Sequence, residues 1–370
     1  MKRLLCLVLC AVLLSGVRIS AMAVSAKAAA VINGDTGEIL FSQNADEKLP
    51  MASTTKIMTA LLLCEHGEPE KEITVTADML RVEGSSMGLL ASDRVTYHDL
   101  LYGMMLASGN DAANVTAIAL GGSVEQFVEK MNAKAAELGL SNTHFVTPSG
   151  LDADGHYTTA AELAALAAYA LKNENFAKAA ASESAVLNYG NPPYRRSLKN
   201  HNKMLKLYDG AVGVKTGFTK KSGRCLVSAA RQDGKLAVAV TLNDPNDWED
   251  HAALLDFGLS EIKQTDYSPK TSMYAIPVIG SDTEKLQVFI EPYTVNTLET
   301  QNINCTVNLP KFLYAPIKKG EVLGSAVYTL NGKVIGTVEL KALTGAEPYS
   351  ESPGIAEILI RNIKYIFLNF

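Results

Sequence analysis

The chain reads Leu-Pro-Met-Ala-Ser-Thr-Thr-Lys-Ile-Met-Thr-Ala from Leu49 to Ala60, and the residues on either side of Ser53 predict a helix. Pro50 precedes the expected first turn, an apolar run continues to Leu63, and Gly67 marks the end. Such a run is typical of a helix buried in the core of a domain. Ser53 would lie at the amino end of this helix, where free N–H groups and the helix dipole stabilise a developing alkoxide.

Lys56 follows Ser53 by three residues, so the two share one face of the expected helix about one turn apart. A lysine can accept a proton only if its pKa falls, which burial and a neighbouring cation both bring about. The same serine also fits an ordinary helix N-cap, and Ser-x-x-Lys recurs at Ser260 and Lys263. This motif alone therefore assigns no function.

A second motif, Ser-Gly-Asn, runs from Ser108 to Asn110 and is expected on a loop between two helices. Ser108 is a candidate for relaying a proton to a leaving amine. Asn110 is a candidate for holding Lys56 or a substrate amide. The alternative is that either residue only caps the following helix, which is common for serine and asparagine.

A third motif, Lys-Thr-Gly, runs from Lys215 to Gly217 and is expected on a strand over 212–219. Further strands over 224–231 and 235–242 would complete an antiparallel meander. Lys215 is the cation expected beside Lys56, Gly217 lets two backbones approach closely, and the N–H groups of Phe218 and Ser53 would form an oxyanion hole. A lysine that simply faces solvent on a strand is the alternative.

Together the three motifs, in this order, resemble the catalytic set of penicillin-binding proteins and serine β-lactamases. The segment 49–60 resembles the active-site helix of low-molecular-mass D-alanyl-D-alanine carboxypeptidases. Residues 107–113 resemble the second motif of that family, with glycine where many β-lactamases have aspartate. Residues 142–151 and 209–218 resemble two further family stretches. The likeness is strong over residues 28–262 and continues more weakly to about 343.

The resemblance implies an α+β protein. Its first domain would have the β-lactamase/transpeptidase-like fold, in which an antiparallel sheet lies beside a helix cluster. A small all-β domain and a C-terminal amphipathic helix would follow. The implied boundaries are a signal peptide over 1–26, the penicillin-binding domain over 27–265, the all-β domain over 272–345 and the amphipathic helix over 355–370.

The implied reaction removes the terminal D-Ala from peptidoglycan stem pentapeptides that end in D-Ala-D-Ala, through an acyl-enzyme on Ser53. β-Lactam antibiotics would inhibit it covalently, and no cofactor is implied. Lys56 would be the base, Ser108 and Asn110 would assist proton transfer and orientation, and the substrate would be bound by Lys215, Thr216, Gly217 and Phe218. Arg224 or Lys203 would help to hold the substrate carboxylate.

Two other functions remain open at this point. A serine β-lactamase needs fast deacylation, often by a glutamate in a Glu-x-x-Leu-Asn motif. Residues 183–188 contain one residue too many for that motif. A non-catalytic module that senses peptidoglycan would have no need of both Ser53 and Lys56. Turnover of a D-Ala-D-Ala peptide compared with turnover of penicillin would separate the three functions.

The two ends of the chain suggest export and membrane association. Lys2 and Arg3 precede an apolar run over 4–14, and small residues follow near Ala23, which is typical of a secretory signal; a retained membrane anchor is the alternative. Residues 355–370 are strongly apolar but too short to span a bilayer. They fit a helix lying on the outer surface of the cytoplasmic membrane or, alternatively, one docked on the all-β domain.

Composition argues against several other classes. The 370 residues include 34 Lys and Arg against 39 Asp and Glu, and cleavage after Ala23 would leave 31 basic residues and a formal charge of −8. An acidic chain without basic runs does not indicate nucleic-acid binding. Outside the signal, the widely spaced Cys64, Cys225 and Cys305 form no disulfide framework. The six scattered histidines show no metal-ligand spacing.

The coarse order of elements is a hairpin over 28–42, helices over about 54–171 with a loop at 83–93, and strands that resume near Asp209. A closing helix is expected over 247–262. Short strands are expected over 286–290, 303–309, 322–330 and 334–340.

Overall fold

The computed structural model describes residues 24–298, 303–350, 354 and 359–360. The predicted signal segment up to residue 23 and most of the predicted helix over 355–370 lie outside the described residues. Among the residues that are described, no helix combines the length and the apolar character needed to cross a membrane.

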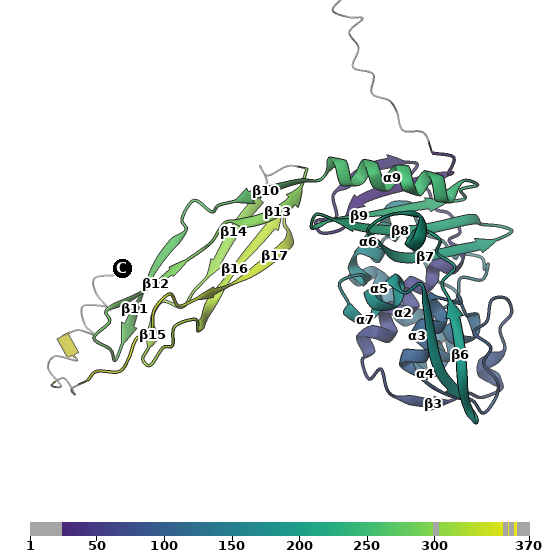
Figure 1. Ribbon diagram of the computed structural model, residues 1–370, viewed down its shortest axis with the longest axis horizontal. Helices are drawn as coiled ribbons and strands as arrows, with labels where there is room; N and C mark the ends of the chain where they lie inside the picture. The colour runs from purple at the N-terminus through teal and green to yellow at the C-terminus, as the bar shows by residue number, and fades with distance from the viewer. Residues whose placement is uncertain (1–23, 299–302, 351–353, 355–358, 361–370) are drawn as a thin grey trace, which may run out of the picture.

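A five-stranded antiparallel sheet forms the centre of the first domain, in the order β2-β1-β9-β8-β7 (Figure 1). The strands are β1 Ala28–Asn33, β2 Ile39–Gln43, β7 Ala211–Thr219, β8 Gly223–Gln232 and β9 Lys235–Leu242. The expected hairpin (β1–β2) and the expected meander (β7–β8–β9) are confirmed. The Lys-Thr-Gly motif lies on β7, which is an edge strand of this sheet.

Both faces of the sheet are buried. Along β1, Ala28, Ala30 and Ile32 pack against the helix cluster. The alternate residues Ala29 and Val31 pack beneath helix α9 (Asp247–Glu261), the expected closing helix. Because side chains alternate across a strand and both faces are covered, the strands read as continuous apolar runs.

The helix cluster covers the sheet face opposite α9 (Figure 1). Its members are η1 Ala52–Thr55, α2 Lys56–His66, η2 Asp78–Leu80, α3 Tyr97–Met105, α4 Asn110–Gly121, α5 Val124–Glu137, α6 Ala160–Ala170 and α7 Glu174–Ala181, where η denotes a 3₁₀ helix. The short helix α8 (Met204–Leu207) lies on the other side, where Met204 packs in the same core as α9. The prediction that the helix after Ser53 is buried is confirmed, because Ile57, Met58 and Leu61 are almost fully inaccessible to solvent.

Two small antiparallel pairs lie among these helices: β3 (Glu72–Thr74) with β4 (Arg94–Thr96), and β5 (Ser184–Gly190) with β6 (Pro193–Lys199). The expectation that strands resume only near Asp209 is therefore wrong. The β5–β6 pair buries few apolar side chains. It therefore lacks the strong alternation by which a strand is recognised.

The C-terminal part is all-β, as expected. Its strands are β10 Lys263–Tyr267, β11 Met273–Ile279, β12 Lys285–Phe289, β13 Tyr293–Thr297, β14 Ile303–Asn308, β15 Leu313–Tyr314, β16 Val322–Leu330 and β17 Lys333–Lys341. Asn331 and Gly332 join β16 to β17 with positive φ at both residues, as a two-residue hairpin turn of type I′ requires.

This β-domain extends away from the first domain as an elongated body (Figure 1). β10 follows α9 directly and pairs with β13. Near this junction, the Asn33 side-chain amide donates to the carbonyl of Asn296 at 2.7 Å, and the Thr297 hydroxyl donates to Glu38 at 2.6 Å. The β1–β2 hairpin therefore contacts the β-domain at its near end, while β7 lies at the far edge of the sheet.

Candidate active site

Ser53 lies in the 3₁₀ turn η1, and Lys56 is the first residue of α2. Side chains at i and i+3 eclipse in a 3₁₀ turn, and here this brings the Lys56 Nζ to 2.8 Å from the Ser53 Oγ. Ser53 remains partly accessible, whereas Lys56 is fully buried. The pair therefore consists of a partly accessible hydroxyl and an amine that is shielded from solvent.

The amine of Lys56 has two further partners. It donates to the Asn110 Oδ1 at 2.7 Å and to the carbonyl oxygen of Ser149 at 2.6 Å. Burial, and secondly the charge of Lys215, hold the pKa of Lys56 well below its usual value, while Asp111 opposes this shift. A lysine in such surroundings is neutral at a lower pH than usual and can accept a proton.

Ser108 and Lys215 form a second pair. The Lys215 Nζ donates to the Ser108 Oγ at 3.0 Å and to the carbonyl of Thr216 at 2.9 Å. Burial lowers the pKa of Lys215 to about 7. Ser108 has a positive φ of 56° between α3 and α4, a conformation that is uncommon for serine and often found at functional sites.

The strand β7 lies against the backbone of Ser53. A Cβ at Gly217 would lie 3.0 Å from the Ser53 nitrogen and 3.1 Å from the Met51 oxygen, so glycine permits this close approach. The next residue, Phe218, is 66% exposed and lines the same cleft as Ser53.

An open cleft of about 370 Å³ joins these groups, and its lining includes Ser53, Ser108, Thr216, Gly217 and Phe218. Lys203 and Arg224 line its outer wall together with Trp248, over whose ring the two cations lie at 5.8 and 5.5 Å. Arg224 also pairs with Asp247 at 2.7 Å. Five of the eight predicted site residues thus line one cleft. The other three, Lys56, Asn110 and Lys215, are buried and connect to Ser53 and Ser108 through the hydrogen bonds given above.

Sequence reasoning missed several groups at the site. The carbonyl of Ser149, which binds Lys56, has no side-chain signature, although it lies in the stretch 142–151 that resembled the family. Ser85 and His201 also line the cleft. Both stand on connecting segments where no periodic pattern marks a functional residue. Among the described residues, no group of three or more His, Cys, Asp or Glu is arranged to hold a metal ion.

Comparison with known proteins gives two family matches. Residues 16–246 match the family described as D-alanyl-D-alanine carboxypeptidase, and residues 264–347 match the C-terminal domain of penicillin-binding protein 5. The D-alanyl-D-alanine carboxypeptidase DacF of Bacillus subtilis (strain 168) is 33% identical over 359 residues, which cover 90% of this chain and 92% of that protein.

Solved structures agree with these matches. The D-alanyl-D-alanine carboxypeptidase DacD from Francisella tularensis has a TM-score of 0.65 at 26% identity, covering 90% of this chain and 96% of that chain. The Streptomyces K15 DD-transpeptidase has a TM-score of 0.62 at 31% identity, covering 64% of this chain and 98% of that chain. By sequence and by fold, this chain belongs to the D-alanyl-D-alanine carboxypeptidase family of low-molecular-mass penicillin-binding proteins.

Proposed function

We propose that this protein is a serine-type D-alanyl-D-alanine carboxypeptidase that removes the terminal D-Ala from peptidoglycan stem pentapeptides through an acyl-enzyme on Ser53. The observation that carries the proposal is the contact between Lys56 and Ser53 at 2.8 Å, in which a fully buried amine of lowered pKa lies beside an accessible hydroxyl. This pairing activates a nucleophile without a histidine.

In the proposed first half-reaction, neutral Lys56 takes the proton of Ser53 as the Oγ attacks the carbonyl carbon of the penultimate D-Ala. The N–H groups of Ser53 and Phe218 would stabilise the oxyanion. The C–N bond then breaks, and the proton that Lys56 took from Ser53 passes through the Ser108 hydroxyl to the departing D-Ala amine, which leaves Lys56 neutral again. The Ser108 Oγ lies 3.0 Å from the Lys215 Nζ. In the second half-reaction, water attacks the ester and Lys56 accepts a proton from it. The bond between the acyl carbon and the Ser53 Oγ then breaks, and Lys56 returns the proton to the Oγ, which regenerates Ser53 and neutral Lys56.

The edge strand β7 supports binding of an extended peptide, which would add a further strand to the sheet. Lys215 and Thr216 would hold the terminal carboxylate, and Arg224 and Lys203 on the outer wall add positive charge near it. Asp247 forms an ion pair with Arg224, which fixes the orientation of the guanidinium toward the cleft wall.

A β-lactam mimics the acyl-D-Ala-D-Ala end, so we predict that Ser53 forms a long-lived acyl-enzyme with penicillin. Mass spectrometry after incubation should show one adduct, on the peptide that contains Ser53, and Ser53→Ala should remove it. An adduct on another residue, or none in protein that releases D-Ala, would refute the assignment. Rapid release of hydrolysed penicillin without D-Ala release would indicate a β-lactamase, and binding without any turnover would indicate a sensing module.

The proposal includes the chain's location and organisation. Residues 1–26 would be a signal peptide that exports the protein, and the penicillin-binding domain over 27–265 would precede an all-β domain over 272–345. Residues 355–370 would form an amphipathic helix that holds the enzyme on the outer face of the cytoplasmic membrane. The placement of Glu357, Arg361 and Lys364 at i, i+4 and i+7 supports a polar helical face among apolar residues.

A further inference from the structure

The loop over residues 83–93, here called the 83–93 loop, holds Asn110 by two hydrogen bonds. The backbone N–H of Asn110 donates to the carbonyl of Ser85 at 2.6 Å, and its side-chain Nδ2 donates to the carbonyl of Glu83 at 2.6 Å. The remaining amide atom, Oδ1, accepts from the amine of Lys56 at 2.7 Å. The position of this loop therefore sets the orientation of the side chain that holds the proposed base.

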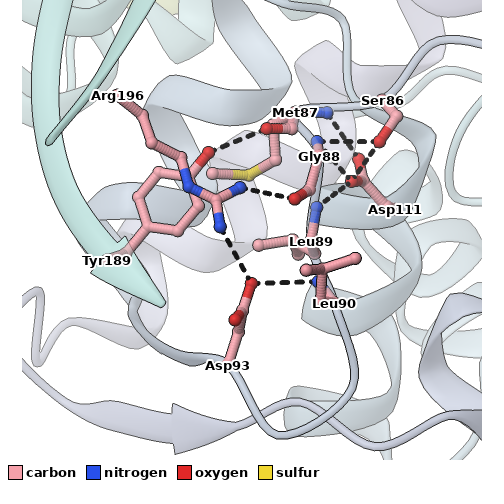
Figure 2. Close-up of polar contacts among 9 residues, drawn as sticks. All are labelled: Ser86, Met87, Gly88, Leu89, Leu90, Asp93, Asp111, Tyr189 and Arg196. Carbon is pink, nitrogen blue, oxygen red and sulfur yellow. Dashed lines mark hydrogen bonds and ion pairs between the residues drawn. The ribbon is translucent and has the colours of Figure 1, made fainter. Parts of the chain in front are cut away.

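Asp111 fastens the loop to α4 from the inner side (Figure 2). Its carboxylate accepts hydrogen bonds from the Ser86 hydroxyl at 2.6 Å and from the backbone N–H groups of Met87 and Leu89, each at 3.0 Å. Asp111 is the residue after Asn110, so the loop is tied to the same helical turn that carries Asn110.

The β5–β6 hairpin holds the loop from the outer side (Figure 2). Arg196 donates to the carbonyl of Gly88 and pairs with Asp93 at 3.2 Å, while the hydroxyl of Tyr189 donates to the carbonyl of Met87 at 2.8 Å. The Arg196 guanidinium lies 4.2 Å from the ring centre of Tyr189 and 4.1 Å from that of Tyr194. The planar guanidinium thus binds the loop with its edge while its faces contact aromatic rings.

The ion pair that joins the β5–β6 hairpin to the 83–93 loop is well shielded from water. The side chains of Arg196 and Asp93 are only 9% and 5% exposed, so solvent screens their interaction far less than that of a surface pair. The β5–β6 hairpin has few buried apolar residues, so burial of apolar surface contributes little to its packing against the 83–93 loop. Its contacts with the 83–93 loop are directed at main-chain carbonyls, which fix the path of the loop backbone.

We infer that Arg196, assisted by Tyr189, is a positioning residue for acylation: it holds the 83–93 loop against α4, and the loop in turn holds Asn110 on Lys56. The inference rests on the proposed function, because it assigns Arg196 a part in the reaction at Ser53. Arg196 itself touches neither Ser53 nor the substrate cleft; it acts through the loop.

The test compares Arg196→Gln and Tyr189→Phe with the control Arg195→Gln. Arg195 precedes Arg196 on β6 and is exposed, so its side chain points to the opposite face of the hairpin. We expect Arg196→Gln to lower the rate constant of acylation by benzylpenicillin roughly 10- to 100-fold, because a displacement of about 1 Å in a catalytic site has effects of this size. Initial binding of penicillin should change much less. Tyr189→Phe should cause a smaller fall, and Arg195→Gln none.

A second readout separates positioning from mere folding. A loosened loop admits water to Lys56, which raises its pKa, so the acid limb of the acylation rate should move to higher pH in Arg196→Gln. The charged groups that act on Lys56 are Lys215 on β7 and Asp111 on α4, and neither is altered. Loss of folded protein would lower the amount of acylated protein at every pH but would leave the pH of the acid limb unchanged. Hydrogen exchange at Met87 and Leu89 should be faster in the same variant.

The inference is overturned if Arg196→Gln acylates within about twofold of the Arg195→Gln control, or if the acid limb stays in place. It is also overturned if the loop amides exchange faster while acylation is unchanged. Should Arg196→Gln fail to fold, Tyr189→Phe, which removes one hydroxyl, decides by the same measurements. If the wild-type protein is not acylated at all, the proposed function fails instead, and the two failures are distinguishable.

Discussion

At the scale of single residues, the chemistry depends on keeping one amine neutral. Lys56 has three oxygen atoms within hydrogen-bond distance of its Nζ and no exposed surface. We predict that Lys56→Arg keeps a basic side chain and the fold but loses acylation by about 10²- to 10⁴-fold, the usual range for removal of a general base. Arginine cannot serve as this base because its pKa is too high.

The measurement for Lys56→Arg is the acylation rate with benzylpenicillin, with thermal unfolding as the control for the fold. Lys134→Arg is a matched control, since Lys134 pairs with Glu65 and Glu137 away from the cleft. A Lys56→Arg protein that acylates at nearly the wild-type rate would remove Lys56 from the mechanism.

Lys215 and Lys56 together should make the acylation rate depend on pH. As pH falls through the lowered pKa of Lys56, the amine becomes protonated and acylation is lost, which gives an acid limb. As pH rises through about 7, Lys215 loses its charge, which gives an alkaline limb in the free enzyme. We predict that Lys215→Gln removes the alkaline limb. The same change should move the acid limb to higher pH, because a cation that lowers the pKa of Lys56 is gone. The pH profile of acylation tests this, and an unmoved acid limb would contradict it.

At the scale of elements, the helices and strands that could be predicted from the sequence are those with a strong apolar pattern. The helix after Ser53 and the meander carrying Lys215 are buried on two sides, and their apolar runs reveal them. The β5–β6 hairpin escapes prediction because Tyr189 and Arg196 are held by hydrogen bonds to a distant loop and by a contact with each other. Such tertiary contacts leave no period in the sequence.

The candidate site likewise contains groups that could be predicted from the sequence and groups that could not. Ser53, Lys56, Ser108, Asn110 and Lys215 belong to short motifs, so their side chains could be nominated from sequence. The carbonyls that complete the site, from Ser149, Glu83 and Ser85, could not. Any residue type supplies a carbonyl, so only the folded path of the chain reveals its role.

At the scale of the whole molecule, the β-domain leaves the first domain near the β1–β2 hairpin, remote from β7. We predict that deleting residues 355–370 from the mature protein releases it from phospholipid vesicles and leaves D-Ala release from a soluble peptide unchanged. Burial of several large apolar side chains, at about 1.5–3 kcal/mol each, would suffice for peripheral binding. Vesicle sedimentation of full-length and truncated protein measures the effect.

Two results would count against this anchoring. One is that the truncated protein sediments as the full-length protein does, and the other is that the full-length mature protein does not sediment. Unfolding of the β-domain on truncation, seen as loss of its own thermal transition, would instead indicate that residues 355–370 pack against the β-domain. Activity should be unchanged by the truncation, because no residue of the three motifs lies beyond Phe218.

The edge position of β7 also bears on antibiotic resistance. A peptide or a β-lactam aligned on this strand would be held largely by backbone N–H and C=O groups, which every amino acid presents alike. Side-chain substitutions along the strand therefore have little means of rejecting the drug while keeping the natural substrate. Selection under antibiotic pressure should instead favour changes elsewhere, such as those that shorten the lifetime of the drug adduct or raise the amount of enzyme in the envelope.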